Sequence, residues 1–75
     1  MQVAVIHPPR GLTWSDAIEL FGAEIVRLYW NVTRARAQLR RGDYDADPKR
    51  KAEVCAWLNA RAAELVKRGL MSDRQ

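Results

Sequence analysis

Apolar side chains recur at a helical spacing through the first half of this 75-residue chain. Between residues 14 and 39 they are separated alternately by four and three positions, which keeps them on one helix face in a heptad pattern. The pattern consists of Trp14, Ile18, Phe21, Ile25, Leu28, Val32, Ala35 and Leu39. Thr13 or Ser15 can cap the start of such a helix, and Gly42 can end it in a left-handed conformation. The spacing predicts one continuous helix over residues 14–41.

A second helix is predicted after a short polar loop at residues 42–47. Asp47 is a favourable N-cap, and Pro48 suits the first helical position because the N–H that proline lacks has no partner there. Gly69 gives a glycine stop after a further apolar pattern, so we expect this helix over residues 48–68. Because the loop is short, the second helix must turn back antiparallel to the first.

The ends of the chain complete a single small domain over residues 1–75. Residues 1–12 form an N-terminal arm, because the prolines and glycine in residues 7–11 cannot join a helix. The β-branched run at residues 3–6 is expected to be extended, and residues 69–75 form a tail. The predicted fold is all-α, an antiparallel two-helix hairpin with a short extended N-terminal arm.

Residues 12–23 resemble the opening of a helix-turn-helix, in which a glycine ends one helix and a recognition helix follows. The recognition helix of that motif would need a hydrophobic residue where this chain has Asn31. The heptad pattern also passes through Gly22 without a change of phase, and a glycine inside a helix costs only ~1 kcal/mol relative to alanine. We therefore predict a helix that continues through Gly22, and keep a degenerate helix-turn-helix as the alternative.

The predicted helices leave apolar surface uncovered. At ~1.5 Å per residue the first helix spans about 40 Å and the second about 31 Å, so Trp14 and Ile18 extend beyond the shorter partner. A second apolar stripe runs along the first helix at Ala23, Val26, Trp30, Thr33 and Ala37. A chain of this size builds a small core, and the lone Cys55 cannot form an intrachain disulfide. These features predict a homodimer that forms a four-helix bundle.

Charge and composition narrow the classes of function. Lys and Arg number 13 against 9 Asp and Glu, a net charge of +4 that suits nucleic acid or an acidic protein partner without selecting either. No apolar run approaches the ~20 residues that span a bilayer, so we expect no membrane association and a cytoplasmic location. One histidine, one cysteine and no paired buried carboxylates offer neither a nucleophile with its base nor a metal site. The composition therefore predicts a non-enzymatic protein without a cofactor or metal.

Two groups of residues are candidates for binding. Trp30 lies off the heptad face beside Tyr29, Arg27 and Arg34, and tryptophan is enriched at binding hot spots, so these four residues form the predicted partner-binding site. The second group holds basic residues that the loop brings to one end of the hairpin, where they could contact nucleic acid or an acidic partner. Its members are Arg36, Arg40, Arg41, Lys49, Arg50 and Lys51.

These groups predict a small regulatory or adaptor protein that acts by protein–protein binding as a homodimer. The alternative is a nucleic-acid-binding regulator that uses the basic hairpin end or the degenerate helix-turn-helix.

Overall fold

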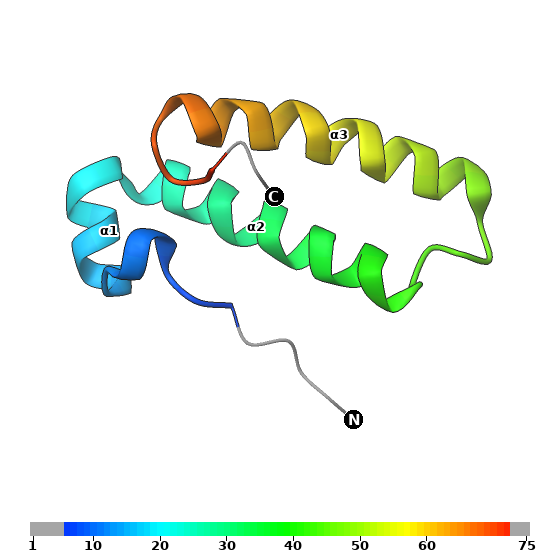
Figure 1. Cartoon of the computed structure of the whole chain (residues 1–75), viewed down its shortest axis with the longest axis horizontal. Helices are drawn as coiled ribbons and strands as arrows, with labels where there is room; N and C mark the ends of the chain where they lie inside the picture. The colour runs from blue at the N-terminus through cyan, green and yellow to red at the C-terminus, as the bar shows by residue number, and fades with distance from the viewer. Residues whose placement is uncertain (1–5, 73–75) are drawn as a thin grey trace.

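The computed structural model describes residues 6–72, which form three α-helices and one short 3-10 turn (Figure 1). The elements are η1 (Pro9–Gly11), α1 (Trp14–Phe21), α2 (Ala23–Arg41) and α3 (Pro48–Lys67). The predicted all-α class is therefore confirmed for the described part of the chain. Of the segment expected to be extended, residues 3–5 lie outside the described residues.

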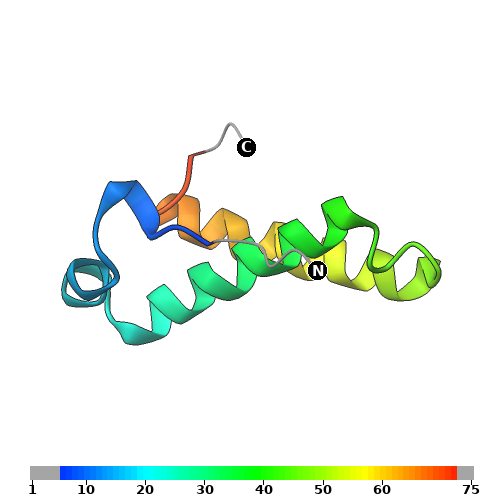
Figure 2. The ribbon, with the colours of Figure 1, turned by 90° about the horizontal axis from the view of Figure 1, so that it is seen from below.

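The predicted continuous helix over residues 14–41 is wrong, because the chain breaks at Gly22. This glycine has φ 93° and ψ 150°, a conformation essentially restricted to glycine. The break turns α1 across the end of the α2–α3 pair, so that α1 runs crosswise in Figure 1 and is seen end-on in Figure 2. The rings of Trp14 and Tyr29 consequently lie 6.2 Å apart between centroids. In one unbroken helix these residues would be separated by about 22 Å along the axis.

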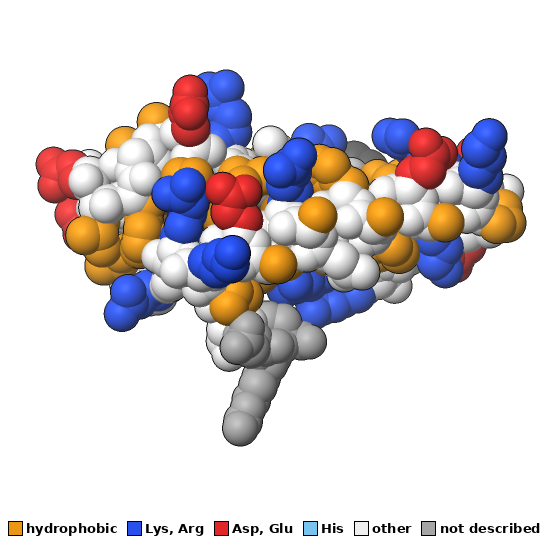
Figure 3. Space-filling model, turned by 90° about the horizontal axis from the view of Figure 1, so that it is seen from above, with side chains coloured by type: hydrophobic (Ala, Val, Ile, Leu, Met, Phe, Trp, Pro, Cys, Tyr) orange, Lys and Arg blue, Asp and Glu red, His pale blue; other side chains and the backbone are white. Residues whose placement is uncertain are grey.

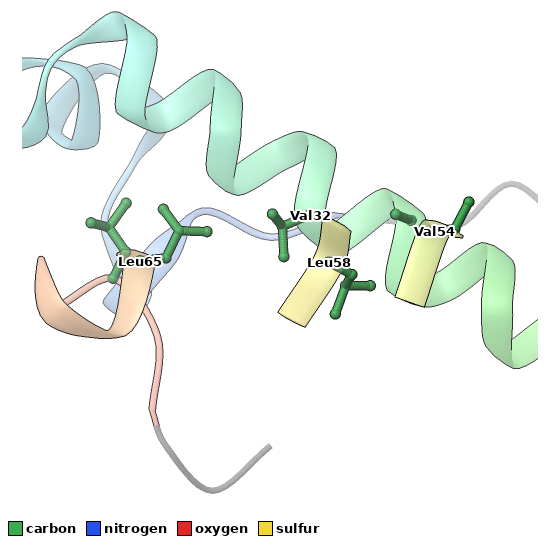
Figure 4. Packing of buried hydrophobic residues seen from close by; sticks show 6 residues of the cluster. Val32, Val54, Leu58 and Leu65 are labelled. Atoms are coloured by element: carbon green, nitrogen blue, oxygen red, sulfur yellow. The ribbon is translucent and has the colours of Figure 1, made fainter. Parts of the chain in front are cut away.

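The hydrophobic core lies between α2 and α3, which run side by side in opposite directions (Figure 1). Its buried members are Val32 and Ala35 from α2, Val54, Leu58 and Leu65 from α3, and Leu70 from the segment that follows. Figure 4 shows side chains of this cluster from close by, with Val32, Val54, Leu58 and Leu65 labelled. Val32 and Ala35 belong to the predicted heptad face, which therefore identifies correctly the side of α2 that meets α3.

The capping residues predicted from the sequence stabilise the helix ends. The Thr13 hydroxyl accepts a hydrogen bond of 3.0 Å from the backbone N–H of Asp16 at the start of α1. The Asp47 carboxylate accepts one of 3.1 Å from the N–H of Arg50 at the start of α3. Gly42 ends α2 with φ 82° and ψ 21°, the left-handed conformation that favours glycine. These contacts satisfy backbone groups that a helix end otherwise leaves unpaired.

The chain after α3 folds back on the core. Gly69 has φ 86°, and the N–H of Leu70 donates to the carbonyl of Leu65 at 3.0 Å, a helix stop of the Schellman type. Leu70 is only 4% exposed, and Met71, assigned to the tail by the sequence, packs partly buried against the core. This segment and the N-terminal segment lie on the same side of the α2–α3 pair (Figure 2). They form the two walls of a groove described below.

Candidate functional site

Two of the three tryptophans remain exposed at the surface. Trp30 on α2 and Trp57 on α3 are each 38% exposed. Trp57 borders a groove of about 450 Å³ between the two helices, and Arg34 borders the same groove from α2. The guanidinium carbon of Arg34 also lies 5.4 Å from the centroid of the Trp30 ring, within the range of a cation–π contact. Arg34 thus joins Trp30 to the groove.

We call this surface the tryptophan face. It consists of Trp30 and the groove residues Asn31, Arg34, Ala35, Gln38, Tyr44, Arg50, Glu53, Val54 and Trp57. Ala35 and Val54 belong to the buried core, so the groove has an apolar floor. Its rim is polar, and the Tyr44 hydroxyl donates a 3.0 Å hydrogen bond to the Gln38 amide oxygen, which ties the loop to α2. An apolar centre inside a polar rim is the usual anatomy of a protein–protein interface.

The structure separates the four residues predicted to bind a partner. Arg27 and Arg34 lie one turn before and after Trp30 on α2, where all three are exposed. Tyr29 points elsewhere: its ring packs near Trp14, and its hydroxyl donates a 3.0 Å hydrogen bond to the backbone carbonyl of His7. Tyr29 therefore holds the N-terminal segment and does not belong to the tryptophan face.

Trp57 is the tryptophan of this face that the sequence did not single out as a site residue. The core positions on α3 are Val54, Leu58 and Leu65. Trp57 precedes Leu58 by one residue and therefore points about 100° away from it around the helix. That difference in phase is the signal that could have identified Trp57 as a surface tryptophan.

The predicted basic end is partly neutralised by its own loop. Arg41 forms an ion pair of 2.6 Å with Asp43, and Lys51 forms one of 2.8 Å with Asp45. The pKa values of Arg41 and Lys51 are raised, first by the hydrogen bond to the carboxylate and then by its charge. Because both pairs are exposed to solvent, they contribute little to stability. They nevertheless place negative charge beside two of the predicted basic contacts.

The other predicted basic residues lie on different surfaces. Arg50 borders the groove of the tryptophan face, and Lys49 is exposed in the first turn of α3. Arg36 and Arg40 border a second groove, of about 550 Å³, which we call the arginine groove. It is lined by Ile6, Arg10, Tyr29, Thr33, Arg36, Ala37, Arg40, Gly69, Leu70, Met71 and Ser72. The predicted basic residues therefore do not all line one groove.

Comparisons with protein-family models, with curated proteins and with solved structures found no match to this chain. None of the helices formed by residues 6–72 combines the length and apolar character needed to cross a membrane. Across the same residues, no three His, Cys, Asp or Glu side chains are grouped so that they could hold a metal ion. The tryptophan face and the arginine groove are therefore the surfaces on which a function can be argued.

Proposed function

We propose that this chain is a small, non-enzymatic regulatory or adaptor protein that acts by protein–protein binding through the tryptophan face. The observation that carries the proposal is the partial exposure of Trp30 and Trp57 beside a groove whose floor is the core itself. Tryptophan and arginine are the residues most enriched at binding hot spots, and Arg34 contacts both Trp30 and the groove. By contrast, the outer side of α3 carries hydrophobic side chains scattered among charged ones (Figure 3).

We take the occupant of the tryptophan face to be a second copy of the chain. The buried hydrophobic core of the described residues contains no aromatic side chain, and its largest members are leucines. A core of this size rarely supplies more than about 3–5 kcal/mol, and small proteins commonly gain the rest from a disulfide, a metal or a partner subunit. Cys55 is a free thiol. Association through the tryptophan face would supply the missing apolar burial.

The charges on the tryptophan face suit a two-fold symmetric dimer. An interface of this kind pairs a surface with itself, so any charges on it can be matched across the interface only if both signs are present. The groove is bordered by Arg34 and Arg50 and also by Glu53. In a symmetric pair the arginines of one copy would face the glutamate of the other. Such complementarity would fix the register of the dimer while the tryptophans supply most of its affinity.

The alternative of a nucleic-acid-binding regulator has less support. The basic residues lie on separate surfaces, and Arg41 and Lys51 are paired with loop aspartates. A helix-turn-helix joins its helices through a turn of about 3–4 residues, whereas only Gly22 separates α1 from α2. Both features favour the protein–protein proposal.

Alanine substitutions at Trp30 and Trp57 test the proposal by sedimentation equilibrium. Each substitution is expected to raise the dissociation constant of the dimer by about 30-fold or more, which is the loss of affinity typical for truncating a buried interface tryptophan. Helix content measured by circular dichroism should stay unchanged, because both side chains are already partly exposed in the single chain. Leu20→Ala is the matched control, since Leu20 is 64% exposed on α1, outside the tryptophan face. A chain that remains monomeric up to millimolar concentration, or a control that weakens the dimer equally, would contradict the proposal.

A further inference from the structure

The arginine groove lies on the opposite side of α2 from the groove of the tryptophan face. Arg36 in the arginine groove follows Arg34 by two residues, which places it about 200° further round the helix. The N-terminal and C-terminal segments both lie on this side of the helix pair (Figure 2) and supply the other walls. Its volume of about 550 Å³ is in the range of small-molecule sites. The two grooves share no lining residue.

Three arginines line this groove from two parts of the chain. Arg36 and Arg40 lie one turn apart on α2, and Arg10 comes from the N-terminal segment. The guanidinium of Arg10 reaches the C-terminal wall, because its Nη1 would lie 3.8 Å from a Cβ atom placed on Gly69. Arg36 and Ser72 already have interaction partners, so Arg10 and Arg40 carry the argument.

The groove has no compensating negative charge among the described residues. Its lining over residues 6–72 contains no Asp or Glu, and no carboxylate in that range forms an ion pair with Arg10 or Arg40. A concave surface lined by charges of one sign concentrates the opposite ion. The groove therefore suits an anion.

The backbone at Arg10 supports the same conclusion. Arg10 has φ 57° and ψ 26°, and it is the one residue other than glycine with a positive φ among residues 6–72. This left-handed conformation costs roughly 1–2 kcal/mol for a residue with a side chain. Residues held in such conformations concentrate at functional sites. Here Arg10 lines the same groove as Arg36 and Arg40.

We propose that the arginine groove binds a small molecule that carries a phosphate group. The planar guanidinium matches phosphate oxygens with two parallel hydrogen bonds, which makes arginine a preferred residue for phosphate. Ile6, Leu70 and Met71 on the lining offer apolar contact to an organic group attached to the phosphate. A nucleic acid strand would need basic surface beyond the groove, where Arg41 is instead paired with Asp43. The ligand is therefore a small phosphate ester, and this proposal is independent of the tryptophan face.

A nuclear magnetic resonance titration of the ¹⁵N-labelled full chain tests the proposal, with adenosine monophosphate as the probe. Adenosine monophosphate and inorganic phosphate should shift amide resonances around Arg36 and Arg40 in a saturable manner, whereas adenosine should not. Arg10→Gln and Arg40→Gln should each weaken binding by about tenfold or more, since each removes a charge-assisted hydrogen-bond pair. Arg40→Lys should weaken it less, because lysine keeps the charge and loses only the paired geometry.

Arg61→Gln is the matched control, because Arg61 is an exposed arginine of α3 that does not line the groove. It should leave the affinity unchanged. The proposal fails if neither phosphate compound gives a saturable shift, or if Arg61→Gln costs as much affinity as Arg40→Gln. It also fails if a single-stranded oligonucleotide binds far more tightly than the mononucleotide with a steep dependence on salt, which would mark a nucleic-acid surface. None of these results depends on whether the chain dimerises, so either proposal can be contradicted while the other stands.

Discussion

Replacing Gly22 with alanine should destabilise the fold through the backbone alone. A Cβ atom added at this position meets no other atom within 4 Å, so no steric clash contributes. The conformation at φ 93° and ψ 150° costs an L-residue about 1–3 kcal/mol. Alanine also favours an unbroken helix over glycine by ~1 kcal/mol. Together these effects oppose the observed break by about 2–4 kcal/mol, a large part of the ~3–5 kcal/mol that so small a core supplies.

Urea unfolding followed by circular dichroism measures this effect. Chemical synthesis of the chain allows D-alanine at position 22 as a control, because a D-residue tolerates the positive φ that strains its mirror image. We expect the L-alanine chain to lose about 2 kcal/mol or more of unfolding free energy and the D-alanine chain to lose less than about 1 kcal/mol. If the L-alanine chain proves as stable as the natural one, or more stable with a higher helix content, then α1 and α2 are not separated at Gly22.

Substitutions at three further positions test the core, a helix cap and an ion pair. Leu65→Ala should cost about 2–5 kcal/mol in urea unfolding because Leu65 is fully buried, and a loss below about 1 kcal/mol would show that α3 packs differently. Asp47→Ala removes the cap on the Arg50 N–H and should cost about 0.5–2 kcal/mol, whereas Asp47→Asn, which can still cap, should cost less. The pKa of Lys51 is raised by its hydrogen bond to Asp45 and by the charge of that carboxylate. The pair therefore stabilises the fold at pH values below the pKa of Lys51 in the unfolded chain, and this effect is lost as the pH rises through the pKa of Lys51 in the folded chain. The small stability difference between the natural chain and Lys51→Gln should therefore be present at about pH 8 and shrink as the pH rises through the raised pKa of Lys51, and a difference that does not shrink in alkali would exclude the ion pair as its cause.

The helix ends could be predicted from the sequence because their chemistry is local. Thr13 and Asp47 cap helices through hydrogen bonds to residues three positions later, and Gly42 ends α2 through its own backbone conformation. The break at Gly22 is part of the helix-turn-helix alternative, but the apolar spacing, which continues through Gly22 unchanged, favours an unbroken helix. Whether a glycine adopts a positive φ there depends on contacts made after the turn, such as that between Trp14 and Tyr29.

Only part of the candidate surfaces could be predicted from the sequence. Trp30 and Arg34 could be identified because they lie off the heptad face of a single helix. The arginine groove could not, since it brings Arg10 together with Arg40 and Gly69 from three separate segments of the chain. The pairing of Arg41 with a loop aspartate could not be predicted either, because it depends on how the loop folds. Contacts between distant segments are set by the whole fold, not by local spacing.

An isotope-filtered nuclear Overhauser experiment tests the proposed interface most directly. The sample mixes ¹³C,¹⁵N-labelled and unlabelled copies of the natural chain, so that only contacts between copies give cross-peaks. We predict intermolecular cross-peaks from the indole protons of both Trp30 and Trp57, because the tryptophan face pairs with itself in the dimer. The absence of intermolecular cross-peaks at millimolar concentration would contradict the account. Cross-peaks confined to Ile18 and Leu20, the exposed apolar residues of α1, would equally place the interface elsewhere.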